Sequence, residues 1–171
     1  MDEPAQAPVG KDGEKVAPVR SVNLRRQARE LAMQYLYQQD LAGGEDGRPI
    51  LQALASLPEV GDESLRARSF AAELAKGVLS RKEILDKKIH QYAQNWSLAR
   101  IAAVDRAILR LAIYELLFRE DIPPVVSINE AIDLAKNYST SDSGRFVNGI
   151  LDRVKLELTR PLRTAVQPGR E

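Results

Sequence analysis

The sequence contains no cysteine and only one histidine, and these two scarcities exclude several kinds of functional site. Without cysteine the chain can form neither a disulfide nor a thiolate metal site, and it has no cysteine nucleophile. The single histidine, His90, cannot supply a multi-histidine metal site. The lack of cysteine fits an intracellular protein, and we expect neither a bound metal nor another cofactor.

The sequence also lacks the local patterns of common enzymes, membrane proteins and secreted proteins. It has no glycine-rich phosphate loop and no GxSxG motif. No apolar run reaches about 18 residues without a charge, and the N-terminus has neither a basic start nor an apolar signal core. We therefore expect no catalytic activity and no membrane insertion, and we predict a cytoplasmic protein.

Positive and negative charges nearly balance, with 25 Lys and Arg residues against 24 Asp and Glu residues and a net charge of +1. Whole-protein charge therefore does not indicate a nucleic-acid partner, and such a partner must be inferred from local clusters. The 171 residues, 44% of them hydrophobic, are enough for one domain with a real core.

The most apolar stretch, residues 101–118, is predicted to be a central helix that ends before Pro123 and Pro124. A helix that is apolar on most sides must be covered on most sides, so the other segments should pack around it. Its charged residues are scattered around the helix axis, and we interpret them as ordinary solvated or paired positions: Asp105, Arg106, Arg110 and Glu115.

The other periodic segments are also helical, and we find no convincing alternating strand. This pattern predicts an all-α domain over residues 22–159, with a disordered arm at 1–21 and a disordered tail at 160–171, where Pro, Gly and charged residues are frequent. Capping-box patterns occur at residues 80–83, where the long helix could divide, and at 127–130. Besides the central helix, the predicted helices cover about residues 23–41, 49–57, 62–92, 125–138 and 145–158.

The first predicted helix carries a basic stripe, which is the first functional signal in the chain. Arg25, Arg26 and Arg29 lie beside its buried face, and Tyr37 continues their line. Arginine binds phosphate with its planar fork, and an exposed aromatic ring can stack on an unpaired base. The alternative is a solvated helix face with Tyr37 in the core.

Three further features are weaker. The Ser- and Gly-rich residues 139–144 precede the last helix, where an anion could approach, although ordinary capping explains them equally well. Gly149, inside that helix, suggests the close approach of another helix or a ligand. A second basic cluster at residues 81–90 is interleaved with acids, as is typical of a solvated face.

Five segments, taken in order, resemble the NusB family of transcription antitermination factors. They are residues 25–30 (RRQARE), 34–37 (QYLY), 104–116 (VDRAILRLAIYEL), 128–136 (INEAIDLAK) and 145–152 (RFVNGILD). The resemblance covers roughly residues 24–156. It implies about six or seven helices arranged as two small bundles that share one core, and no catalytic activity.

The resemblance also implies a function and a set of site residues. NusB proteins bind the boxA element of nascent ribosomal RNA leader transcripts together with the small-subunit ribosomal protein NusE, and the pair joins the antitermination complex on RNA polymerase. Asp105 and Asp142 are our candidates for contact with NusE. Gln27 departs from the longer arginine run of some relatives, which suggests either a weaker grip on RNA or a grip helped by Arg20, Lys15 and Lys11 in the arm. The positions that match RNA-binding residues of the family are Arg25, Arg26, Arg29, Tyr37, Tyr92 and Phe146.

Two other interpretations stay open at this point. The chain could be a helical interaction module, or a homodimer, whose basic stripe meets an acidic protein without specific RNA binding. A homodimer could also bury the same arginine face. Alternatively, RNA cytosine methyltransferases carry a NusB-like domain ahead of a catalytic domain, and this chain would then be a fragment of one.

Overall fold

The computed structural model describes residues 20–44, 47–57 and 64–167. Every regular element in these ranges is a helix. A single 3-10 turn, η1 (Leu98–Arg100), lies between α4 and α5. The predicted all-α class is confirmed. The α-helices are α1 (Arg20–Ala42), α2 (Ile50–Ala55), α3 (Ser64–Ser80), α4 (Lys82–Tyr92), α5 (Ala103–Phe118), α6 (Pro124–Tyr138) and α7 (Ser141–Lys155).

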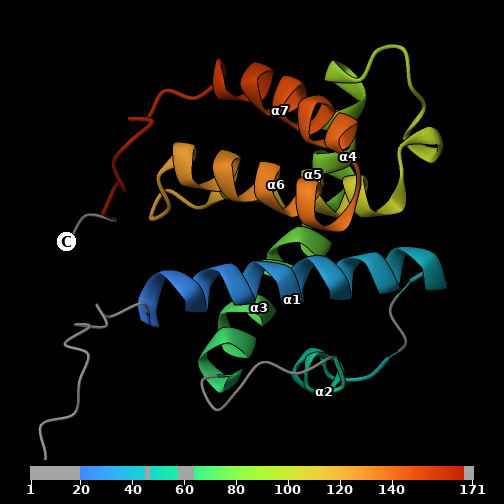
Figure 1. Ribbon diagram of the computed structural model, residues 1–171, viewed down its shortest axis with the longest axis vertical. Coiled ribbons are helices and arrows are strands. Elements are labelled where there is room, and N and C mark those ends of the chain that lie inside the picture. The colour runs from blue at the N-terminus through green and yellow to red at the C-terminus, as the bar shows by residue number, and fades with distance from the viewer. Residues whose placement is uncertain (1–19, 45–46, 58–63, 168–171) are drawn as a thin grey trace, which may run out of the picture.

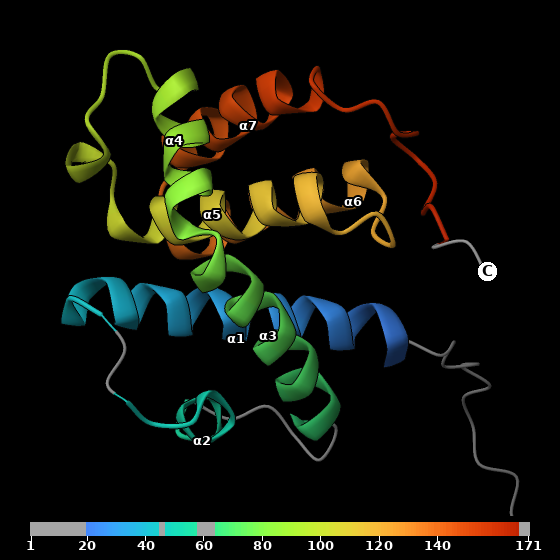
Figure 2. The same cartoon turned by 180° about the vertical axis from the view of Figure 1, so that it is seen from behind.

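Helix α5 is the centre of the fold. Figure 1 shows α1, α2 and α3 on one side of it and α4, α6 and α7 on the other, and Figure 2 shows the same arrangement from behind. Helix α5 packs against α1, α3, α4, α6 and α7, and from Asp105 to Leu116 every residue except Arg106 is buried. The buried apolar residues of both groups of helices form one cluster. The predicted two bundles with a shared core are therefore confirmed.

The charged residues of α5 are paired and join the two bundles. Arg110 reaches Asp86 of α4 and Asp40 of α1, with nitrogen–oxygen distances of 2.6 and 3.1 Å. Glu115 accepts hydrogen bonds from Arg29 of α1 and from the hydroxyl of Ser127 in α6. These charges are therefore paired positions, one of the two alternatives that the sequence left open, and they join α5 to helices on different sides of it.

Two helix starts differ from the sequence prediction. Helix α1 begins at Arg20, so Arg20 and Ser21 belong to a helix and not to the predicted arm. Helix α5 begins at Ala103, because η1 precedes it and Ile101 has extended backbone angles, φ −72° and ψ 132°.

Both predicted capping boxes are wrong, although the long helix does divide where the first one was predicted. Helices α3 and α4 separate at Arg81, whose φ of −122° is not helical. There the Ser80 hydroxyl donates to the Gly77 carbonyl and caps nothing. Ser127 lies inside α6, which starts at Pro124 because proline is favoured in the first helical turn.

The segment after α7 packs against the body of the protein, whereas the sequence predicted residues 160–171 to be a disordered tail. The Val125 N–H donates to the Leu162 carbonyl at 3.0 Å, and the Val166 N–H donates to the Glu120 carbonyl at 2.8 Å. Arg160 donates to four carbonyls at the end of α5 and just beyond it, those of Glu115, Leu116, Glu120 and Ile122. Residues 1–19, 62–63 and 168–171, to which parts of the predictions refer, lie outside the described residues.

Candidate nucleic-acid interface

Two adjoining hollows lie between the connection from α4 to α5 and the first half of α7. Their volumes are about 330 and 300 Å³, and both are lined by Trp96 and Phe146, so we name them together the Trp96–Phe146 groove. The larger hollow is also lined by Tyr92, Ala93, Gln94, Asn95, Arg145, Gly149, Ile150 and Arg153, and the smaller one by Arg100, Ile101, Ala102, Asp105, Thr140, Asp142 and Ser143.

The aromatic side chains of the groove combine exposure with support from the core. Trp96 is 53% exposed, whereas Phe146 is half-buried and packs against the hydrophobic core. Gly149 lies one turn after Phe146 in α7, and a Cβ added to it would meet nothing within 4 Å. The close helix approach predicted from Gly149 is therefore wrong, because this position opens into the groove.

Arginine side chains hold the wall of the groove that carries Trp96. Arg106 donates to the carbonyls of Leu98 and Ile101 at 3.1 and 2.7 Å, and its other nitrogens bind Asp40 of α1. Burial alone would raise the pKa of Asp40, but hydrogen bonds from Arg106 and Arg110 outweigh it and hold the pKa below its usual value. The η1 turn is therefore fixed to α1 and α5 by charge-assisted hydrogen bonds.

The opposite wall is the start of α7, which is held by a chain of hydroxyl groups. Thr140 caps the helix and accepts a hydrogen bond from the Ser143 N–H at 3.2 Å. The Ser143 hydroxyl donates to Asp105 at 2.9 Å. Asp105 is only 5% exposed, and its Oδ1 has no hydrogen-bond partner among the described residues. Asp142, by contrast, is exposed at the rim, so the two predicted partner contacts lie in different environments.

Three arginines border the groove. Arg100 and Arg145 are exposed, and neither forms an ion pair with a carboxylate in the described ranges. Arg153 is exposed as well and donates to the Tyr92 carbonyl at 3.2 Å. Sequence reasoning missed all three of these arginines. The groove therefore combines exposed cations with aromatic side chains, which is the combination that binds single-stranded RNA.

Tyr92 contributes its ring to the groove while its hydroxyl is engaged elsewhere. The hydroxyl donates to Glu157, which also binds Lys88 at 2.6 Å. The hydrogen bond to Glu157 raises the pKa of Tyr92 above its usual value. Only the ring of Tyr92 is thus available to a ligand, and its position is fixed.

The three arginines of the predicted stripe do not lie on one exposed face. Arg25 lies over the ring of Phe70 in α3, with its guanidinium carbon 5.2 Å from the ring centre. Arg26 is directed toward α6, where it binds Glu130 and Asp133 at 3.0 and 2.8 Å.

Arg29 is 3% exposed and makes two hydrogen bonds to Glu115, at 2.8 and 3.3 Å. The side chains diverge because α1 is covered by α3 on one side and lies beside α6 and α5 on the others (Figures 1 and 2). Helical spacing places these residues near one another but does not show which neighbouring helix each one meets.

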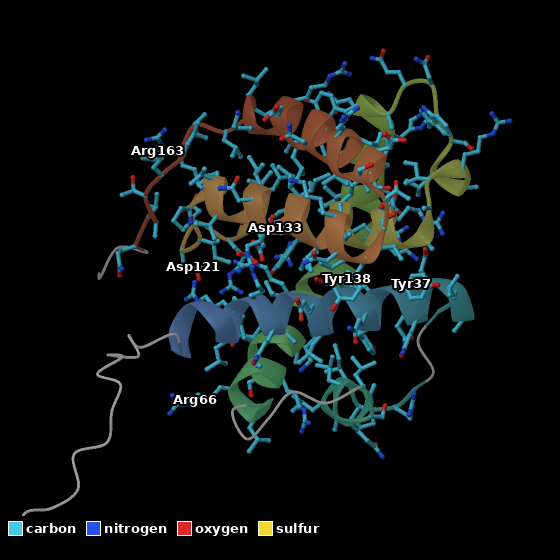
Figure 3. The ribbon with its side chains drawn as sticks, in the orientation of Figure 1. Tyr37, Arg66, Asp121, Asp133, Tyr138 and Arg163 are labelled. Atoms are coloured by element: carbon cyan, nitrogen blue, oxygen red, sulfur yellow. The ribbon has the colours of Figure 1, made fainter. Side chains whose placement is uncertain are left out.

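Tyr37 is half-buried and packs against the core, as the alternative interpretation of the sequence predicted in part. Tyr138, the last residue of α6, is 41% exposed and contacts Glu30 and Gln34 of α1 (Figure 3). Burial and the neighbouring Glu30 raise the pKa of Tyr138. Sequence reasoning missed Tyr138 and Trp96. The signal for Trp96 was the only tryptophan of the chain standing in a polar segment, residues 94–97.

Comparison with known proteins identifies the family. The model of the NusB family matches residues 26–155. The chain belongs to the NusB family. The transcription antitermination protein NusB of Geobacter sulfurreducens is 49% identical over 130 residues, which cover 76% of this chain and 92% of that protein. The NusB of Myxococcus xanthus is 42% identical over 137 residues, covering 80% and 98%.

Solved NusB structures share the fold. The structure of T. maritima NusB has a TM-score of 0.67 and 41% identity, and the match covers 78% of this chain and 91% of that one. A chain from a crystal structure of antitermination factors NusB and NusE in complex with dsRNA has a TM-score of 0.66 and 27% identity, covering 80% and 98%. The NusB match includes both walls of the groove and ends at the last residue of α7.

No helix within residues 20–44, 47–57 and 64–167 is long and apolar enough to span a membrane. In the same ranges, no three His, Asp or Glu side chains are grouped so that they could hold a metal ion.

Proposed function

We propose that this protein is a transcription antitermination factor that binds the boxA element of nascent ribosomal RNA leader transcripts together with NusE. The observation that carries the proposal is the Trp96–Phe146 groove, which lies in a NusB-family fold and combines aromatic rings with arginines that have no carboxylate partner. This protein and NusE together then support processive transcription by RNA polymerase. The protein acts by binding and not by catalysis, in the cytoplasm where the transcript forms.

Each part of the groove has a distinct task in this proposal. Trp96, Phe146 and the ring of Tyr92 stack on unpaired bases, because every base offers a flat face to an aromatic ring. Arg100 and Arg145 contact phosphates at the rim.

The predicted site residues divide into two groups under this proposal. Phe146, Tyr92 and Tyr37 stay RNA contacts, and Asp142 stays a contact for NusE because it is exposed at the rim. Asp105 is a positioning residue, because its carboxylate holds Ser143 and so the start of α7. Arg26 and Arg29 stabilise the fold through their ion pairs. Arg25 belongs to α1 and lies outside the groove, with its guanidinium over Phe70 of α3.

The test is binding of the protein, alone and with NusE, to a boxA-containing RNA and to a scrambled RNA over a salt series. Selective binding of the boxA RNA, tightened by NusE, is the expected result. Equal and weak binding to both RNAs, unchanged by NusE, would contradict the proposal and favour an interaction module. Sedimentation with and without RNA then shows whether a homodimer forms and whether RNA dissociates it.

A further inference from the structure

The outward side of α3 and the residues around it carry a second group of cations, which the groove does not include. We name it the α3 face and define it by Arg25, Arg66, Lys76, Arg81 and Arg119. Figure 2 shows α3 crossing over α1 on this side of the molecule, and none of the residues that line the Trp96–Phe146 groove comes from α3. Arg66, labelled in Figure 3, lies at the start of α3.

Three of these arginines lie over aromatic rings. The ring of Phe70 lies between Arg25 and Arg119, whose guanidinium carbons are 5.2 and 5.4 Å from its centre. Arg81 lies 4.6 Å from the centre of the Phe118 ring. A guanidinium over a ring can still donate from its N–H groups to an anion, as Arg119 does to Asp121, while the ring face that it covers is closed to a base.

A glycine makes this arrangement possible. The ring of Tyr114 lies across Gly77 of α3, so that a Cβ added to Gly77 would be 2.1 Å from two atoms of the tyrosine side chain. Tyr114 in turn stacks on Phe118, with ring centres 5.9 Å apart, and Arg81 lies over both rings. The cation at Arg81 is therefore held in place by a packed aromatic pair.

The charges of the α3 face are not balanced locally. Its acidic residues, Glu73 and Asp121, both pair with Arg119, at 3.6 and 2.8 Å. The other cations of the face, Arg25, Arg66, Lys76 and Arg81, form no ion pair with a carboxylate in the described part of the chain. A net charge of +1 for the whole protein thus hides a basic surface.

Lys76 also borders a hollow of about 450 Å³ beside α3. Its other lining residues are Tyr35, Arg48, Pro49, Ile50, Leu79 and Ser80, and none of these is acidic. The face therefore adjoins this hollow at Lys76.

We propose that the α3 face binds backbone phosphates of RNA that extends beyond the segment held in the groove. This inference rests on the proposed function, which supplies the RNA. The rise of a helix places Arg66 and Arg81 roughly 22 Å apart, so the cations follow a line, as the phosphates of one strand do. Because arginines cover ring faces of Phe70 and Phe118, no base can stack there. The contact therefore depends on charge and not on the RNA sequence.

An acidic protein is the less favoured partner for this face. Protein interfaces depend on a buried apolar centre with a few dominant side chains. Here the outward positions between the cations are Ser69, Glu73 and Ser80, all exposed. Interfaces with nucleic acid are more polar and more positive, as this face is.

The experiment compares two RNAs, a short one limited to boxA and a longer one with boxA and flanking nucleotides. Affinities are measured over a salt series for the wild type and for the double variant Arg66→Ala with Lys76→Ala. Both residues are exposed, so their removal should leave the fold intact. We expect the longer RNA to bind with a steeper salt dependence. The double variant should lower that slope by roughly 1.4, about 0.7 for each lost phosphate contact.

The matched control removes two cations elsewhere. Lys87→Ala with Arg163→Ala also removes two positive charges. Both residues lie away from the α3 face, since Lys87 pairs with Glu83 on α4 and Arg163 lies in the segment after α7. The control should keep the wild-type slope with the longer RNA. Binding of the short RNA should be the same in all three proteins.

Several results would overturn the inference. Equal slopes for the wild type and the α3 double variant with the longer RNA would remove the α3 face from RNA binding, while the proposed function stands. An equal loss with the short RNA would place the contact within boxA. Polyglutamate that binds the wild type, and binds the double variant more weakly while RNA affinity is unchanged, would identify an acidic protein as the partner. A wild type that binds neither RNA would overturn the proposed function and this inference together.

Discussion

Arg26 and Arg29 of α1 are paired with carboxylates, whereas Arg100 and Arg145 of the groove are not, among the residues that the structure describes. Arg26 and Arg29 reach across to α6 and α5 and are neutralised there by Glu130, Asp133 and Glu115. Arg100 and Arg145 lie at the rim of the groove and have no carboxylate partner in the described ranges. We name the first region the seam, since it joins the two bundles.

Under the proposed function, this difference means that the number of basic residues in a segment does not locate an RNA site. A guanidinium that already holds two carboxylates must lose those interactions before it can bind a phosphate, and that loss offsets the gain. An exposed arginine without a partner has no such cost. Substitutions in the seam should therefore lower stability, and substitutions in the groove should lower RNA affinity.

The largest effect is expected from Arg29→Ala. It leaves Glu115, which is 1% exposed, as a buried carboxylate without its cation, and this should lower the free energy of unfolding by about 3–5 kcal/mol. Chemical denaturation measures the change. Arg25→Ala is the control on the same helix, and it should cost less than about 1 kcal/mol, because Arg25 is exposed and loses only its contact with Phe70. Equal losses for the two variants would contradict the assignment of Arg29 to the seam.

In the groove, Phe146→Leu should have the opposite profile. Leucine keeps an apolar side chain against the core but removes the ring, so the affinity for boxA RNA should fall by about 1–3 kcal/mol. Titration of labelled RNA measures the affinity, and denaturation verifies that the variant is folded. If the folded variant binds RNA as tightly as the wild type, Phe146 is a core residue and no base stacks on it.

Local and periodic information was sufficient to predict the helices and the central position of α5, whereas the arrangement in two bundles was implied by the resemblance to the NusB family. The apolar character of residues 101–118 indicated a central helix, and α5 is that helix. The division near residues 80–83 was also anticipated, although the capping explanation for it was wrong. Periodicity identifies which face of a helix is apolar, and that is enough to place helices around a core.

The pairing of charges could not be predicted in the same way, because the partners are far apart in the sequence. Arg29 and Glu115 are separated by 86 positions, and Arg26 and Asp133 by 107. A helical wheel shows that Arg26 and Arg29 are near each other, but it does not show which helix covers them. Trp96 was missed for a related reason, since it lies in an irregular segment without a period.

Asp40 of α1 links the central helix to the groove. It binds Arg106 and Arg110 of α5, and Arg106 also holds the η1 turn in the wall of the groove. Its pKa is held low in the folded state, so its stabilising contribution is present above the pKa of the unfolded chain. That contribution is lost as the pH falls through the folded-state pKa. Asp40→Asn should therefore cost about 1.5–3 kcal/mol at neutral pH.

Denaturation of the wild type and of Asp40→Asn at a series of pH values measures this dependence. The difference between the two proteins should shrink as the solution becomes more acidic. A difference that is constant with pH would mean that Asp40 contributes through packing and not through its charge.

The smallest effect should come from Arg26→Ala, and it distinguishes the two regions most directly. Arg26 is 43% exposed at its side chain, so the loss of its ion pairs should cost less than about 1 kcal/mol of stability. Since its guanidinium is already occupied, RNA affinity and its salt dependence should not change. Arg145→Ala removes the same charge from the groove and should lower the salt slope by roughly 0.7. If Arg26→Ala flattens the slope as much as Arg145→Ala does, Arg26 leaves Glu130 and Asp133 when RNA binds. The seam would then be part of the RNA interface, because its ion pairs would be exchanged for phosphate contacts.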